Sequence, residues 1–239
     1  MPHDGPLPHT SQTAAILDSS SLRGNLVASE RRYRNYQRDQ STPNRPSKVA
    51  LASMAGLELL GADEVRRTVV TFRDAMRAHA PGINRLNVYP VPDGDTGTNM
   101  SRTLDAVVAE LEGAGPEMDA TCKAISHGSL MGARGNSGVI LSQILRGLVA
   151  TINESSDGKV NAARMADALK RASAAAYEAV LKPIEGTILT VVREAADGAA
   201  AAAVGGATLS ATLQAARTAG RDALARTPDL LPVLKDAGV

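Results

Sequence analysis

Two aspartates separated by one glycine, Asp93 and Asp95, begin a polar stretch of the chain. Two carboxylates this close on a glycine turn provide the hard oxygen ligands that Mg2+ prefers, and backbone amides beyond them face the same space. A simple turn or a helix cap also explains an isolated Asp-Gly-Asp sequence. More oxygen and amide donors lie close by than a cap needs, which favours a magnesium and phosphate site: Asn87, Thr96, Gly97, Thr98 and Asn99.

A second glycine-rich segment precedes an apolar run and contains Gly135, Asn136, Ser137 and Gly138. Backbone amides at a helix start, together with the helix dipole, bind phosphate oxygens. The segment lacks the Gly-Lys-Ser or Gly-Lys-Thr ending of a Walker loop, and a helix rather than a strand is expected before it. Taken alone, it is explained equally well as a turn between helices. Arg134 in the same segment could neutralise phosphate charge or remain solvated.

A third segment, with Gly186 and Thr187 after Pro183, again places a glycine and a hydroxyl at the start of an expected helix. Alone it is only a helix start. Three such starts in one molecule are stronger evidence for a phosphate site than any one of them alone. If consecutive helices run antiparallel, the second, fourth and sixth helices begin at the same end, so the three segments are predicted to share one anion pocket.

The elements that must position these segments are helices. Apolar residues recur three or four positions apart, and alanine, the best helix former, is abundant from residue 162 onward, while Trp is absent and Phe occurs once. We predict an all-α antiparallel barrel of about eight amphipathic helices. The expected helices span residues 63–82, 96–111, 117–130, 139–152, 162–181, 187–204 and 208–225, with a short terminal piece at 228–236.

Composition narrows the class of protein further. Residues 1–53 are polar and lack sustained apolar periodicity, which predicts a disordered extension before a domain at 54–239. The net charge of +1 argues against nucleic-acid binding. A single cysteine, Cys122, excludes an internal disulfide framework and fits a reducing, cytoplasmic setting. No basic segment leads into an apolar one at the N-terminus, so neither a signal peptide nor a membrane span is expected.

Three ordered strings resemble the N-terminal nucleotide-binding domain of bacterial fatty acid kinase, which is shared with the ADP-forming subunit of dihydroxyacetone kinases. They are LNVYPVPDGDTGTNM at 86–100, GSLMGARGNSGVILSQILRG at 128–147 and KPIEGTILTVVREA at 182–195. The resemblance covers residues 54–239. It implies an eight-helix barrel that binds ATP and two Mg2+ at one end.

By this resemblance, Asp93 and Asp95 hold the metals, with Asn87 at the position nearest to a third family aspartate. Catalysis would depend on Asp93, Asp95 and Arg134. The resemblance also implies transfer of the ATP gamma-phosphate to the carboxylate of a fatty acid that a separate fatty-acid-binding protein presents. The positions expected around the nucleotide are Thr96, Gly97, Thr98, Asn99, Gly135, Asn136, Ser137, Gly138, Gly186 and Thr187.

Members of this family continue beyond the point that corresponds to Val239. We therefore expect a C-terminally truncated barrel that lacks its last helix, and activity of this chain alone is an open question. Two other readings stay open: a dihydroxyacetone-type kinase subunit, and a nucleotide-binding module that is catalytically silent. The assembly state is also open, with a homodimer among the options.

Overall fold

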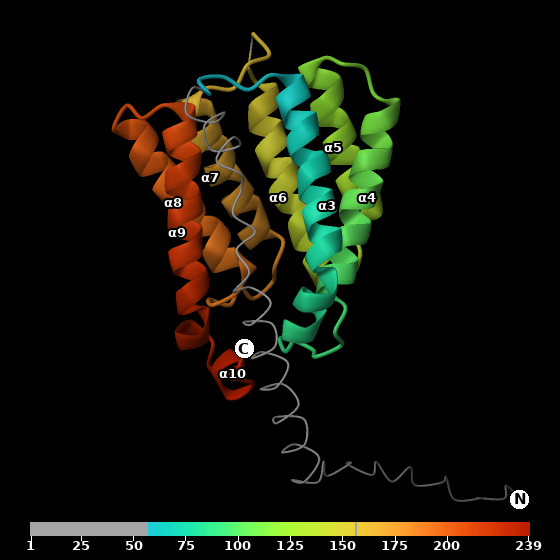
Figure 1. The fold of residues 1–239 in the computed structure, drawn as a ribbon, viewed down its shortest axis with the longest axis vertical. Helices are drawn as coiled ribbons and strands as arrows, with labels where there is room; N and C mark the ends of the chain where they lie inside the picture. Colours follow the sequence, from blue (N-terminus) through green and yellow to red (C-terminus); the bar gives the residue numbers. More distant parts are fainter. Residues whose placement is uncertain (1–56, 156) are drawn as a thin grey trace, which may run out of the picture.

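The computed structural model describes residues 57–155 and 157–239, and these residues form an all-helical bundle (Figure 1). This confirms the predicted all-α class. The expected extension at 1–53 and the start of the domain at Met54 lie outside the described residues. The helices are α3 (Ala62–Leu86), α4 (Thr96–Gly113), α5 (Met118–Gly132), α6 (Gly135–Asn153), α7 (Ala162–Glu178), α8 (Ile188–Val204), α9 (Leu209–Leu230) and the short α10 (Pro232–Asp236).

The core is built from aliphatic side chains and alanine, as the composition predicts. Each helix from α3 to α9 has buried residues, and the largest fully buried apolar side chains include Leu104, Ile125, Ile152 and Leu209. Alanines alone fill much of the space between α7, α8 and α9, where Ala166, Ala199 and Ala216 form a separate cluster. Such small side chains allow helices to approach closely, so the bundle does not depend on aromatic residues.

Consecutive helices pack against each other and run in alternating directions, and α4 also contacts α6 (Figure 1). Glycines stand where the helix axes come closest. A Cβ atom added at Gly97 would lie 2.5 Å from the carbonyl oxygen of Ala80 in α3, and one added at Gly128 would lie 2.8 Å from Cα of Val107 in α4. These contacts bring the backbones of α3, α4 and α5 together.

At the end where α3 begins, residues 57–61 form a strap across the bundle. The carbonyl oxygen of Leu57 accepts a hydrogen bond from the backbone N–H of Ser210, at the start of α9. Leu60 exchanges two backbone hydrogen bonds of 2.9 Å with Val160, just before α7. The strap therefore joins segments that are far apart in the sequence.

The opposite end holds the starts of α4, α6 and α8, together with α10 (Figure 1). The predicted placement of these three helix starts at one end of the bundle is confirmed, because each of these helices follows one that runs in the opposite direction. In the part of the chain that the structure describes, none of the helices has the length and apolar character needed to cross a bilayer.

Several predicted helix boundaries are wrong. The helix expected at 162–181 ends at Glu178, and the one expected at 208–225 continues through Pro228 to Leu230, so the terminal piece expected at 228–236 is reduced to α10 at Pro232–Asp236. The first helix was expected to end near Pro81, but α3 continues through it to Leu86. Proline within a helix removes a backbone hydrogen bond, yet here the following turn packs on α4 and is held there by side-chain hydrogen bonds. The fourth helix begins at Gly135 rather than at Val139, because the glycine-rich segment itself forms its first turn.

Candidate functional site

The loop between α3 and α4 carries the two aspartates. The side-chain amide of Asn87, the residue that ends α3, donates a hydrogen bond of 2.6 Å to Oδ1 of the exposed Asp93. In this arrangement the Nδ2 atom of Asn87 orients the Asp93 carboxylate. The side-chain oxygen of Asn87 is the atom of this residue that could bind a metal ion. Asp95 is the N-cap residue of α4, but its side chain makes no capping hydrogen bond.

The first turn of α4 is held instead by a residue of α3. Oδ1 of Asn84 accepts a 3.1 Å hydrogen bond from the backbone N–H of Thr98, and Nδ2 of Asn84 donates a 2.9 Å bond to the Thr98 hydroxyl. Asn84 is missing from the sequence prediction, because the expected helix end at Pro81 placed it in a loop. An asparagine three residues before Asn87, and so one turn away on the same helix face, was the available signal.

The second glycine-rich segment packs directly on this turn. Gly135 has a φ of +58°, which favours glycine, and a Cβ atom there would lie 2.4 Å from the side-chain amide nitrogen of the buried Asn99. The hydroxyl of Ser137 donates a long hydrogen bond of 3.4 Å to the carbonyl oxygen of Thr96. The starts of α4 and α6 are therefore in contact.

Buried contacts one turn further along hold these two helices in register. A Cβ atom at Gly138 would meet the Thr103 hydroxyl at 2.6 Å, so only glycine fits here. Thr103 in turn donates to the carbonyl oxygen of Asn99 at 2.8 Å and also lies 3.3 Å from that of Gly132. Asn99 is buried because its side chain packs on Gly135 and its carbonyl oxygen accepts the hydrogen bond of Thr103.

Arg134 and Asn136 are both exposed beside this contact. The guanidinium of Arg134 donates to the carbonyl oxygens of Met131 and Ala133, at 3.3 and 2.8 Å. It thus caps the C-terminus of α5 in this arrangement. A solvated guanidinium at the surface can leave such bonds at small cost, so both sequence interpretations of Arg134 are compatible with this geometry.

The third segment, before α8, is at the same end of the bundle but is held by different neighbours. Gly186 has a φ of +80°, and a Cβ atom there would lie 2.6 Å from that of Leu231 and 2.9 Å from the carbonyl oxygen of Thr227. The Thr187 hydroxyl caps its own helix: it accepts from the backbone N–H of Leu189 and donates to the carbonyl oxygen of Ile184. The turn before α8 is therefore held by the end of α9 and by Leu231, the residue between α9 and α10.

Glu185 organises the charges around that turn. Its carboxylate accepts hydrogen bonds from Thr190 at 2.6 Å, from Arg193 at 2.7 Å and from the Tyr177 hydroxyl at 3.0 Å. Thr190 accepts in turn from the backbone N–H of Gly186 at 2.8 Å. The Thr190 bond is the main cause that lowers the pKa of Glu185, whereas the pKa of Arg193 is raised, chiefly by its hydrogen bond to Glu185.

The donor set of the first loop suits Mg2+. The carboxylates of Asp93 and Asp95 stand at a helix start, and Asp95 is not engaged in capping. Within residues 57–155 and 157–239, no group of three or more His, Cys, Asp or Glu side chains could hold a metal ion. Two carboxylates without a full protein cage are the usual protein share of a Mg2+ site, whose other ligands are phosphate oxygens and water.

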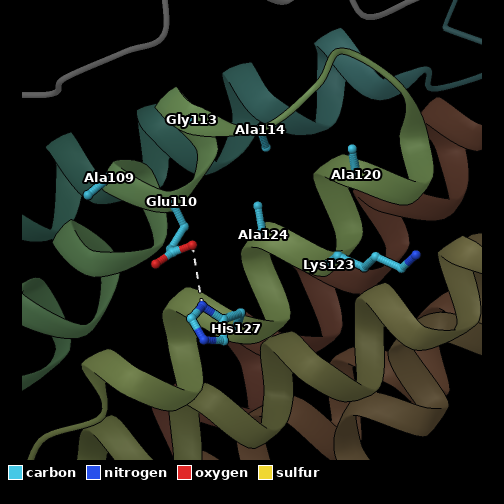
Figure 2. Close-up of a pocket in the computed structure, with 8 residues that line it drawn as sticks. All are labelled: Ala109, Glu110, Gly113, Ala114, Ala120, Lys123, Ala124 and His127. Carbon is cyan, nitrogen blue, oxygen red and sulfur yellow. Dashed lines mark ion pairs between the residues drawn. The ribbon is translucent and has the colours of Figure 1, made fainter.

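A shallow groove of about 390 Å3 lies far from these loops, between the end of α4 and the start of α5. Figure 2 shows His127 and Glu110 facing each other on it, with Nδ1 and Oε2 3.3 Å apart. Lys123 and small residues line the rest. Both members of the pair are exposed, so the pair is a surface ion pair whenever His127 is protonated. We place the candidate site at the helix starts, where polar groups and glycines converge.

Comparison with known proteins gives concordant matches. The model of the DAK2 domain family matches residues 90–239. Protein YloV of Bacillus subtilis is 45% identical over 166 residues, which cover 67% of this chain and 29% of YloV. An uncharacterized protein of Staphylococcus saprophyticus is 44% identical over 162 residues, again 67% of this chain and 29% of the relative. The chain therefore spans less than a third of the length of these relatives.

Proposed function

This chain belongs to the DAK2 domain family, a kinase family associated with nucleotide binding, and on that basis we propose that it binds ATP and Mg2+ where α4, α6 and α8 begin. The observation that carries the proposal is the contact between the first turn of α4, which directly follows the Asp93–Asp95 loop, and the glycine-rich start of α6. It combines metal-type carboxylates with helix N-termini suited to phosphate. Residues 54–239 would form this nucleotide-binding domain.

In this proposal the first two segments have separate tasks. Asp93 and Asp95 hold the metal, with Asn87 orienting Asp93 and offering its amide oxygen. The backbone and side chains of Asn136 and Ser137 contact the phosphates. When bound, Mg2+ supplies positive charge that offsets the charge of the phosphate oxygens. A pair of ions, as in the resembling kinases, would draw on the same carboxylates.

We further propose that the substrate is a fatty acid presented by a separate fatty-acid-binding protein. A carboxylate oxygen of the fatty acid would form a bond to the gamma-phosphorus as the bond to the bridging oxygen breaks, giving an acyl phosphate and ADP. The chain's own contribution is to hold the phosphates in line and to balance charge, with Arg134 free to turn towards them. The support for this substrate is the similarity of the three sequence strings to fatty acid kinase.

Magnesium-dependent ATP binding is the direct test. Calorimetry with the double variant Asp93→Asn, Asp95→Asn should show ATP affinity in Mg2+ reduced by more than about tenfold, since metal sites lose at least this much when their ligands are disturbed. The control is Asp63→Asn, Asp167→Asn, which removes the same charge from exposed positions on α3 and α7. Equal ATP binding with and without Mg2+ in the wild type would rule out the proposed site.

A catalytically silent nucleotide-binding module is the second candidate, because in this arrangement the Arg134 guanidinium is bonded to the carbonyl oxygens of Met131 and Ala133 and the Thr187 hydroxyl caps its own helix. ATP binding without acyl phosphate formation, in the presence of a fatty-acid-loaded partner, would support it. Phosphorylation of dihydroxyacetone on a partner subunit would instead assign the chain to the other branch of the family.

A further inference from the structure

Asn84 lies two residues before the end of α3, outside the residues proposed above to hold metal or nucleotide. Its side chain accepts the backbone N–H of Thr98, the third residue of α4. This is the amide that an N-cap side chain usually accepts. The N-cap of α4 is Asp95, and its carboxylate makes no such bond. The capping bond of α4 therefore comes from another helix.

We propose that Asn84 is a positioning residue that caps α4 from α3 and thereby keeps the Asp95 carboxylate available for Mg2+. Aspartate is among the best N-cap residues, so an Asp95 without competition would accept from the Thr98 amide once its backbone changes from the present αR angles (φ −117°, ψ −2°) to the extended angles of a capping residue. A carboxylate oxygen committed to that bond is a poorer metal ligand. This inference rests on the proposed function, because it concerns the same metal site.

The second bond of Asn84 makes the arrangement specific. Its Nδ2 atom donates to the Thr98 hydroxyl at 2.9 Å while its Oδ1 atom accepts from the Thr98 amide. The side-chain amide therefore grips one residue at two points, and it cannot rotate without losing both bonds. The close approach of Gly97 to the backbone of Ala80 keeps the two helices near enough for this grip.

Another cap in the molecule provides a matched control. Asn161 caps α7 by accepting the backbone N–H of Arg164 at 2.9 Å, the same kind of bond. It lies at the end of the bundle opposite to the aspartate loop (Figure 1). Asn161→Ala should lower the melting temperature at least as much as Asn84→Ala, in which Asp95 takes over the bond to the Thr98 amide. Only Asn84→Ala should change the response to Mg2+.

The test is calorimetric ATP binding by the full chain at a series of Mg2+ concentrations. Asn84→Ala should need about fivefold more Mg2+ for half-maximal ATP binding, the factor that corresponds to a typical capping bond. Asn84→Asp keeps an acceptor for the Thr98 amide and should not raise this requirement. In an Asp95→Ala background, Asn84→Ala should add no further loss. An unchanged requirement in Asn84→Ala, or a full additional loss in that background, would overturn the proposal.

Hydrogen exchange of the Thr98 amide without Mg2+ and nucleotide gives a second readout. Protection should persist in Asn84→Ala, where Asp95 takes over the bond, and disappear in Asn84→Ala, Asp95→Ala. Equal exchange in these two variants would contradict the takeover. If the wild type fails to bind ATP with Mg2+, the proposed function falls, and the exchange measurement alone decides the capping role of Asn84.

Discussion

The contact of Gly97 with α3 predicts that even one added methyl group disturbs the candidate site. In Gly97→Ala the new Cβ atom would lie 2.5 Å from the carbonyl oxygen and 2.7 Å from Cα of Ala80. Both neighbours are backbone atoms and cannot rotate away. The start of α4 must then move by about 1 Å to reach ordinary contact distances.

This displacement has an expected size. Overpacking of this kind costs about 1–3 kcal/mol of unfolding free energy, against a gain of at most about 1 kcal/mol from replacing glycine by alanine in a helix. In a domain of this length each kcal/mol shifts the melting temperature by about 2–4 °C. We expect Gly97→Ala to melt several degrees below the wild type and to bind ATP more weakly in Mg2+, because the Asn84–Thr98 bonds lengthen.

Gly113 provides the control on the same helix. It is the last residue of α4, and a Cβ atom there would have no neighbour within 4 Å. Gly113→Ala should therefore leave the melting temperature unchanged or slightly raised, with ATP binding intact. Thermal unfolding followed by circular dichroism measures both variants. A Gly97→Ala protein that melts at or above the wild-type temperature would show that this helix contact is not as tight as described.

Two further predictions follow from titratable groups. The pKa of Glu185 is lowered in the native protein, first of all by its hydrogen bond with Thr190. As the pH falls, the unfolded chain therefore binds a proton at this carboxylate before the native protein does. The contribution of Glu185 to stability is present above pH 4.5 and is lost as the pH falls through its native pKa. Urea unfolding from about pH 6 to about pH 3 should show a smaller loss of stability in Glu185→Gln than in the wild type, and equal losses would count against this assignment. Burial, and secondarily the charge of Asp119, raises the pKa of the Cys122 thiol from 9.0 to about 11, so a thiol reagent near pH 8 should label Cys122 in urea but scarcely in the native protein. Rapid native labelling would mean that the thiol is accessible.

The helices were predictable because their apolar residues repeat at helical spacing and because alanine favours that conformation. Val65, Val69 and Met76 of α3 are each 8% exposed, as the pattern predicts, whereas Phe72 of the same pattern is 36% exposed at the edge of the bundle. Periodicity identifies the buried side of a helix but not the limits of that side, which depend on where the neighbouring helices lie.

The boundaries near the site were the least predictable part. Local rules end a helix at Pro81 and start the next one after Gly138, since proline and glycine are poor helix residues. Contacts across the bundle override these preferences: the turn after Pro81 is fixed by Asn84 and Thr98, and the glycines of α6 fit against Asn99 and Thr103. Such contacts are between residues distant in sequence, so no local pattern reveals them.

The shared end of the three helix starts was predictable, but the contacts of their side chains were not. The alternating direction of consecutive helices correctly predicts that the three helix starts lie at one end of the bundle. It did not reveal that the Thr187 hydroxyl is already used in capping α8, or that Arg134 lies on the carbonyl oxygens of α5. Hydroxyl and guanidinium groups have several partners within reach, and their choice depends on backbone positions of a few tenths of an ångström.

The strap at residues 57–61 gives the bundle an asymmetric mechanical behaviour. Backbone hydrogen bonds from Leu57 and Leu60 fasten the first turn of α9 and the segment before α7 to the N-terminal edge of α3. At the other end, the loops meet through side chains and glycine contacts. Separation of the helices is therefore opposed by main-chain hydrogen bonds at the strap and, at the aspartate loop, by side-chain and packing contacts.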